Sequence, residues 1–145
     1  MTTGSFRRIL VGWDCSPGAA AALRAAVAVA SDEAARVVVL AVLKPAPSTE
    51  EAEEGAADFG GRQRFAEETF AKACAAVPDG QRARVTLQFA QSGDAARTVC
   101  DYAQEHGFDL LVLGRHGTGG VLHPRLGHVA ATAARKAALP VLLAP

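Results

Sequence analysis

Short apolar runs alternate with helix-like segments along the whole chain, and this alternation restricts the fold more than any other feature of the sequence. The run 36–43 is rich in β-branched residues and too short for a typical helix. A strand that is apolar on both faces belongs in the middle of a parallel sheet. Similar runs predict strands at 9–11, 109–113 and 141–143, whereas 82–90 alternates in polarity, as a half-exposed edge strand does.

Helices are predicted between these strands. The segments 17–30, 62–77, 94–106 and 129–138 place alanine and larger apolar residues at helical spacing. In 62–77 the residues expected on one face include Phe65, Ala66 and Phe70. Ser16, just before the first segment, is expected to cap that helix. Strands and helices in this alternation predict an α/β fold: a single domain over the 145 residues with an open parallel sheet, right-handed crossovers and helices on both faces.

The segment 48–61 interrupts this alternation. It is rich in small residues and carries four glutamates between positions 50 and 54. Because a charge run of this kind is usually a solvated surface, we expect a mobile surface loop with partial helical character rather than a metal site. Residues 78–80, Pro-Asp-Gly, predict a turn.

Composition excludes several classes of protein. The 15 basic and 15 acidic residues give no net charge, whereas non-specific nucleic-acid binding needs a basic excess. The N-terminus lacks the apolar core of a signal peptide, and no apolar run approaches the roughly 20 residues of a membrane span. Cys15, Cys74 and Cys100 show no metal-binding spacing and suggest a reducing compartment. We therefore expect a cytoplasmic protein without nucleic-acid or membrane partners.

A glycine-rich stretch, 110–129, carries the clearest functional signal. It begins as an apolar strand, breaks at Gly114 and leads into an alanine-rich helix. Glycine lets main-chain N–H groups approach an oxyanion closely, and a helix start adds unpaired N–H groups and a positive dipole end. This arrangement predicts a site for the phosphates of a nucleotide. Arg115 is positioned to add charge-assisted hydrogen bonds, or to be a solvated surface residue.

Other motifs are absent or incomplete. The chain has no Walker-type loop, no GxSxG elbow and no dinucleotide fingerprint after its first strand. The spacing of His116, His123 and His128 matches no common metal site. Asp14 follows the first strand, where a carboxylate can accept hydrogen bonds from a ribose or base, or from N–H groups of its own turn. The sequence leaves both roles of Asp14 open.

Together these residues resemble the universal stress protein family. Residues 8–17 are similar to the first strand and Asp-Gly-Ser loop of that family, and 109–114 to its fourth strand. The spacing G-x2-G-x9-G-[ST], a signature of the ATP-binding branch, is matched at its three glycines by Gly114, Gly117 and Gly127.

Two positions depart from the family pattern. His128 stands where the signature has Ser or Thr, and Cys15 replaces the usual glycine. An imidazole can also donate a hydrogen bond to a phosphate oxygen. Because losing one neutral hydrogen bond costs about 0.5–1.5 kcal/mol, we expect nucleotide binding to be retained but weakened or retuned.

The resemblance implies a five-stranded sheet in the order 3-2-1-4-5, with the ends of strands 1 and 4 side by side. It further implies an adenine nucleotide (ATP, or AMP or ADP), with Mg²⁺ held through the phosphates. Asp14 would contact adenine or ribose, and Val42 would meet the base through its main chain. No catalytic residue and no metal ligand is expected. The expected nucleotide-binding residues are Gly12, Trp13, Asp14, Val42, Gly114, Arg115, Gly117, Gly127, His128 and Val129.

The implied function is that of a nucleotide-binding regulatory or signalling module in a stress response. The resemblance also implies a homodimer formed through the terminal strand, Val141 to Leu143. One alternative is a nucleotide-free dimeric scaffold of the same fold. A slow ATPase is less favoured, because only His116 and His128 are candidates for a general base. Enzymatic activity is left open.

Overall fold

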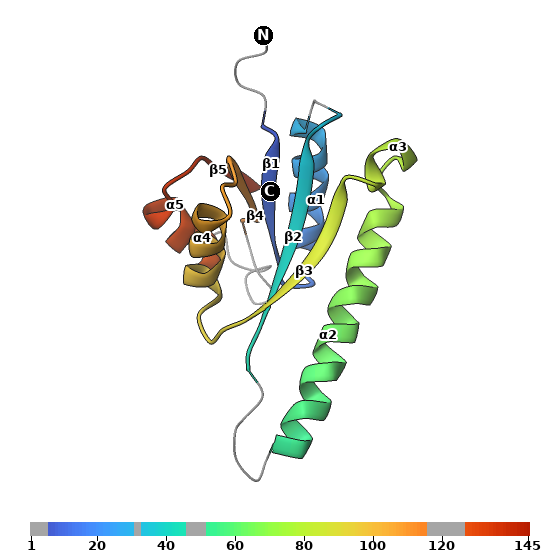
Figure 1. Cartoon of the computed structure of the whole chain (residues 1–145), viewed down its shortest axis with the longest axis vertical. Helices are drawn as coiled ribbons and strands as arrows, with labels where there is room; N and C mark the ends of the chain where they lie inside the picture. The colour runs from blue at the N-terminus through green and yellow to red at the C-terminus, as the bar shows by residue number, and fades with distance from the viewer. Residues whose placement is uncertain (1–5, 31–32, 46–51, 116–126) are drawn as a thin grey trace.

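The computed structural model has a five-stranded, all-parallel sheet in the order β3-β2-β1-β4-β5, which confirms the expected order (Figure 1). The structure describes residues 6–30, 33–45, 52–115 and 127–145. The strands are β1 (Arg8–Trp13), β2 (Arg36–Leu43), β3 (Val85–Gln91), β4 (Leu110–Gly114) and β5 (Val141–Ala144).

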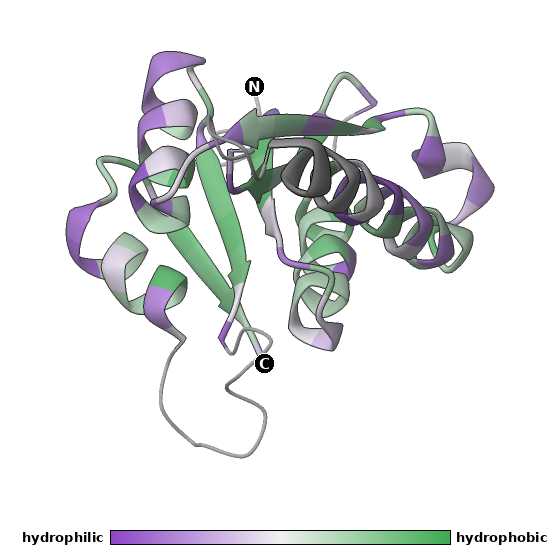
Figure 2. Cartoon of the chain, turned by 90° about the horizontal axis from the view of Figure 1, so that it is seen from below, coloured by the Kyte–Doolittle hydropathy of each residue, from purple (hydrophilic) through white to green (hydrophobic). Residues whose placement is uncertain are grey.

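Helices cover both faces of this sheet. α1 and α2 pack on one face, and α4 and α5 on the other. Figure 2 shows the apolar strands between two helical layers whose outward surfaces are largely polar. None of the described helices is both long and apolar enough to cross a membrane. The helices are α1 (Pro17–Val29), α2 (Ala52–Ala75), α3 (Asp79–Arg82), α4 (Ala95–Glu105) and α5 (His128–Lys136).

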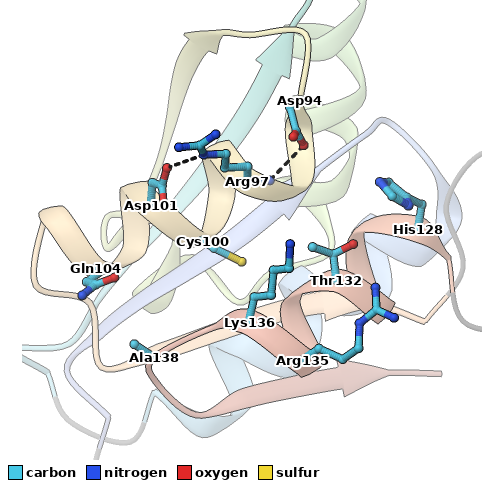
Figure 3. Close-up of a pocket in the computed structure, with 10 residues that line it drawn as sticks. All are labelled: Asp94, Arg97, Cys100, Asp101, Gln104, His128, Thr132, Arg135, Lys136 and Ala138. Atoms are coloured by element: carbon cyan, nitrogen blue, oxygen red, sulfur yellow. Dashed lines mark hydrogen bonds and ion pairs between the residues drawn. The ribbon is translucent and has the colours of Figure 1, made fainter.

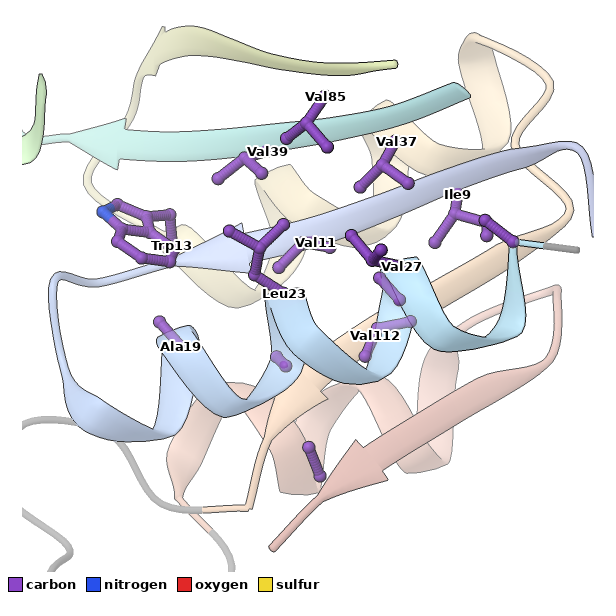
Figure 4. Packing of buried hydrophobic residues seen from close by; sticks show 14 of the residues in the cluster. Ile9, Val11, Trp13, Ala19, Leu23, Val27, Val37, Val39, Val85 and Val112 are labelled. Carbon is purple, nitrogen blue, oxygen red and sulfur yellow. The ribbon is translucent and has the colours of Figure 1, made fainter. Parts of the chain in front are cut away.

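The core has two parts because both faces of the sheet are covered. Side chains alternate along a strand, so Ile9 and Val11 pack toward α1, whereas Leu10 packs toward α4 and α5. All three side chains are fully buried. Figure 4 shows the α1 side, where the strand valines meet Leu23 and Val27 of the helix. This two-sided burial explains why the central strands read as continuous apolar runs.

The partial helical character expected within 48–61 is confirmed, but the helix is longer than expected: α2 begins at Ala52, so the loop part of the prediction is wrong from there onward. The alanines and glutamates of this segment are good helix formers, and they outweigh its three glycines. The first part of the expected loop, residues 46–51, lies outside the described residues.

The turn expected at 78–80 is instead the start of α3, and the strand expected from Arg82 begins three residues later at Val85. Arg82 belongs to α3, and its guanidinium group bonds to the end of α2. Its nitrogens donate to the carbonyl oxygens of Cys74 (3.0 Å), Ala75 (2.9 Å) and Val77 (2.8 Å). A cation at this position satisfies carbonyls that a helix end leaves unpaired.

Phe65 departs from the expected inward face of α2. Helical spacing grouped it with Ala66 and Phe70, but its relative exposure is 57%, whereas Ala66 is buried. The residues of α2 that pack against the core are Ala66, Phe70, Ala73 and Cys74, and Phe65 lies about 100° round the helix from Ala66, outside this stripe.

Candidate functional site

The carboxyl ends of β1 and β4 lie side by side. The two strands are parallel neighbours, with Ile9 opposite Leu110 and Val11 opposite Val112. From β1 the sheet continues through β2 and β3 in one direction and through β4 and β5 in the other. Ligands of open α/β sheets bind beyond the strand ends at such a reversal point.

Asp14 follows β1 directly and is exposed at this edge. Its Oδ1 accepts a hydrogen bond from the Ser16 amide (3.0 Å) and another from the Ser16 hydroxyl. Ser16 in turn caps α1, since its Oγ accepts from the Ala19 amide at 3.1 Å. Asp14 therefore has the turn-stabilising role, while its Oδ2 accepts no hydrogen bond from the described part of the chain. The turn orients this free oxygen by fixing the carboxylate.

Trp13 is buried, and its indole ring does not line the edge of the sheet. Its Nε1 donates to Thr69 Oγ1 at 3.3 Å, and its ring meets Phe70 edge-on, with centroids 6.1 Å apart and an interplanar angle of 88°. Both partners belong to α2. The side chain thus fastens α2 to the sheet, and only the main chain of Trp13 is placed to meet a ligand.

Cys15 has a φ of 66°, the one non-glycine residue with positive φ in the described part of the chain. This left-handed conformation suits the glycine that the family pattern has there, and it strains a residue with a side chain. The side chain is partly buried against the core on the α1 side.

Gly12 and Gly114 stand where a side chain would not fit. A Cβ on Gly12 would lie 2.5 Å from Leu113 Cδ2, a flexible methyl group. A Cβ on Gly114 would lie 2.7 Å from both the carbonyl carbon and the oxygen of Gly18, which are main-chain atoms that cannot rotate away. Sequence reasoning missed Gly18, although its place in the first turn of α1 was a signal for close packing against a neighbouring strand.

The two ends of the glycine-rich stretch are held together by the main chain. The Gly127 amide donates to the Arg115 carbonyl oxygen at 2.6 Å, and the Arg115 amide donates to the Ala144 carbonyl oxygen at 2.9 Å. The end of β4 and the start of α5 therefore meet at one point, next to the end of β1. The residues between them lie outside the described residues, including Gly117, His116 and His123 of the sequence analysis.

The start of α5 lacks a side-chain cap. Its N-cap residue is Gly127, which has no side chain to accept a hydrogen bond from the first turn. By contrast, Ser16 caps α1 and Asp94 caps α4. Gly127 therefore supplies no acceptor for the amides of His128 and Val129, which lie at the positive end of the helix dipole.

The side chains of His128 and Val129 lie on the α4 side of α5. The imidazole of His128 is exposed and lines a groove between α4 and α5. Val129 packs against the core on the α4 and α5 side. If these two residues act as the family signature implies, they do so through their main-chain amides rather than through their side chains.

Val42 lies just beyond the end of β1. The register pairs Trp13, the last residue of β1, with Ala41, so Val42 has no partner in β1. On its other side β2 pairs Val42 with Ala90 of β3. The main chain of β2 thus projects past β1 at the reversal point, where it can offer hydrogen bonds to a base.

Metal and thiol chemistry receive no support from the described residues. No group of three His, Cys, Asp or Glu side chains among them converges on a point. Cys15, Cys74 and Cys100 are all free thiols. Burial raises the pKa of Cys74 and of Cys100, so neither thiol has the lowered pKa of a reactive nucleophile.

Comparisons with known proteins agree on one family. A model of the universal stress protein family matches residues 5–145. None of the curated proteins matches this chain in sequence.

Among solved structures, the universal stress protein UspA from Lactobacillus plantarum has a TM-score of 0.84 at 22% identity, covering 99% of this chain and 100% of its own. A universal stress protein in complex with cAMP has a TM-score of 0.71 at 22% identity, covering 98% and 99%. An Arabidopsis thaliana family member with AMP bound has a TM-score of 0.63 at 16% identity, covering 95% and 90%.

Proposed function

The chain belongs to the universal stress protein family, and on this premise we propose that it binds an adenine nucleotide, ATP or AMP, at the carboxyl ends of β1 and β4. Occupancy of this site would change its partner choice or dimer state, which makes the protein a regulatory module of a stress response. Its three free thiols are consistent with work in the reducing cytoplasm.

The observation that carries this proposal is the 2.6 Å hydrogen bond from the Gly127 amide to the Arg115 carbonyl oxygen. It brings the uncapped start of α5 to the strand ends, where its amides can receive a phosphate. Arg115 lies at the same place, and its exposed side chain would donate a charge-assisted hydrogen bond to the phosphate. Phosphates would therefore lie between the start of α5 and the end of β4.

The base and ribose would lie on the β1 and β2 side of the phosphates. The free Oδ2 of Asp14 is placed to accept a ribose or adenine hydrogen bond, and the main chain of Val42 to meet the base. Two structural relatives carry cAMP and AMP. The described residues offer Mg²⁺ no cluster of carboxylates, so Mg²⁺ would bind through the phosphates of ATP, as it does at many nucleotide sites.

Isothermal titration calorimetry with ATP·Mg²⁺, AMP and cAMP tests the proposal, using two variants of one residue. His128→Ala removes the imidazole and keeps the amide, whereas His128→Pro also removes the N–H. Proline suits the first position of a helix, and Gly127 before it has an extended ψ of 161°, so α5 should remain intact.

We expect His128→Pro to weaken binding about tenfold or more relative to His128→Ala, because a hydrogen bond to a charged group contributes about 1.5–3 kcal/mol. Equal affinities of the two variants would show that the His128 N–H does not contact the phosphate. A loss of affinity shared by both variants relative to wild type would then assign the contact to the imidazole. If wild-type protein binds none of the three nucleotides, the proposal fails and the nucleotide-free scaffold takes its place.

We also propose a homodimer through β5. This strand is at the edge of the sheet, and Val141, Leu142 and Leu143 are only partly buried. An apolar edge strand invites pairing with a second copy. Light scattering should give a dimer mass for the wild type and a monomer mass for Val141→Lys. A monomeric wild type at all concentrations would contradict the dimer without affecting the nucleotide site.

A further inference from the structure

A groove between α4 and α5 has a volume of about 460 Å³ and adjoins the proposed nucleotide site only at His128, the first residue of α5 (Figure 3). This is within the usual size of small-molecule sites, roughly 300–1,000 Å³. Both walls are polar: α4 contributes charged residues between Asp94 and Gln104, and α5 contributes residues between His128 and Lys136.

The charges of the α4 wall are satisfied within α4. Asp94 Oδ1 accepts from the Arg97 amide at 3.1 Å as the N-cap of the helix. The Arg97 Nε atom pairs with Asp101 Oδ2 at 3.5 Å, one helical turn further on. Arg97 offsets one of the two carboxylates, so this wall carries about one net negative charge, less in magnitude than the two positive charges of α5. Its carboxylates can still accept hydrogen bonds from hydroxyl groups.

The α5 wall keeps uncompensated positive charge. Arg135 and Lys136 are both exposed in the last turn of α5, and neither forms an ion pair with any residue that the structure describes. The dipole of α5 offers only about half a negative charge at this end, less than the two positive charges. The Lys136 ammonium group points into the groove, and Thr132 lies near it on the same helix (Figure 3).

Cys100 lies in the groove and does not neutralise Lys136. Burial raises the pKa of the Cys100 thiol, the Asp101 and Asp94 carboxylates raise it further, and Lys136 acts in the opposite direction. The thiol is therefore protonated at neutral pH, and the positive field of Lys136 is left for another anion.

We propose that this groove binds a small organic anion, held by its phosphate or carboxylate group on Lys136, Arg135 and Thr132. Asp94 and Asp101 on the opposite wall would accept hydrogen bonds from hydroxyl groups of the same ligand. The binding is independent of the nucleotide site, because its contacts are side chains of the α4–α5 groove rather than the main chain at the start of α5.

Protection of Cys100 from alkylation tests this proposal in the intact protein. The protein is treated with iodoacetamide at fixed ionic strength, set with chloride, and modification of each cysteine is followed by peptide mass spectrometry. The probes are glycerol 3-phosphate and malate, with glycerol as the uncharged control. Cys74 is an internal control, because its pKa is also raised by burial and it lies on α2, on the opposite face of the sheet.

We expect at least one of the two anions to slow the alkylation of Cys100 severalfold and saturably. Glycerol should not slow it, and the alkylation rate of Cys74 should not change with any probe. Slowing by glycerol 3-phosphate alone identifies a phosphate site, and slowing by malate alone a carboxylate site. The double variant Arg135→Gln, Lys136→Gln should lose the protection, whereas Lys72→Gln, an exposed lysine in the last turn of α2, should keep it.

Three results would overturn the proposal: neither anion protects Cys100, protection persists in the double variant, or protection appears at Cys15 alone. The last result would place the anion at the nucleotide site instead.

Discussion

The main chains of Gly114 and Gly18 are in direct contact, so that a Cβ on Gly114 would lie 2.7 Å from the carbonyl carbon and oxygen of Gly18. The end of β4 is thereby packed against the first turn of α1. Gly114 matches the nucleotide-binding signature of the family, but this contact alone requires glycine there. A nucleotide-binding test that relies on Gly114→Ala would therefore confuse packing with ligand recognition.

Gly114→Ala should destabilise the protein with or without nucleotide. Because the clash is with main-chain atoms, we expect the free energy of unfolding to fall by about 1–3 kcal/mol. Chemical denaturation measures this, with Gly93→Ala as the control. Gly93 is exposed and an added Cβ would meet nothing within 4 Å, so its substitution should change stability by less than about 0.5 kcal/mol. Equal stabilities of the two variants would contradict the close contact.

The stability of variants at Cys15 should depend on how well the new residue tolerates the left-handed backbone conformation. At a φ of 66° a glycine is relaxed, an alanine is strained and a β-branched residue is strained more. We expect Cys15→Gly to be more stable than Cys15→Ala by about 1 kcal/mol, and Cys15→Val to be the least stable. Thermal unfolding of the three variants gives the ranking. If the alanine variant is as stable as the glycine variant, the backbone here is not strained.

Substitutions of Phe65 and of Phe70 should have very different effects on the free energy of unfolding, although both residues lie on α2. Phe65 is 57% exposed, so Phe65→Gln should change the free energy of unfolding by less than about 0.5 kcal/mol. Phe70 packs edge-on against Trp13, and Phe70→Ala should cost about 2–4 kcal/mol. Urea unfolding followed by the fluorescence of Trp13, the single tryptophan, compares them. A large loss in Phe65→Gln would instead place Phe65 in a contact.

Alkaline pH should destabilise the fold through Cys74 and Cys100. Burial raises the pKa of both thiols, so the folded protein holds these protons more tightly than the unfolded chain does. The resulting stability is present below the thiol pKa of the unfolded chain, and it is lost as the pH rises from there through the raised pKa of the folded state. Unfolding midpoints measured from pH 7 upward should therefore decline.

The Cys74→Ser, Cys100→Ser variant supplies the control for this decline. A hydroxyl group does not titrate in this range, so the variant should show a shallower dependence on pH. An identical slope in both proteins would assign the decline to other groups.

Local features of the chain were sufficient to predict most of the elements. The apolar run 36–43 predicted β2 with its observed bounds, and Ser16 was correctly expected to cap α1. Both predictions depend on neighbours within a few residues. Other predictions failed where local signals were mixed. The glycines and glutamates at the start of α2 suggested a loop, and helical spacing allowed more than one inward face at Phe65.

The sequence alone determined the class of the fold, since hydrophobic periodicity is a property of short segments. The glycine content of 110–129 likewise predicted an anion site, which stays a prediction. Only the tertiary structure decided that the Trp13 ring packs under α2, that Gly114 meets Gly18, and that the His128 imidazole lies in the α4–α5 groove. The physical reason is that these contacts join residues of different elements. Their geometry depends on strand order and helix packing, which no local pattern encodes.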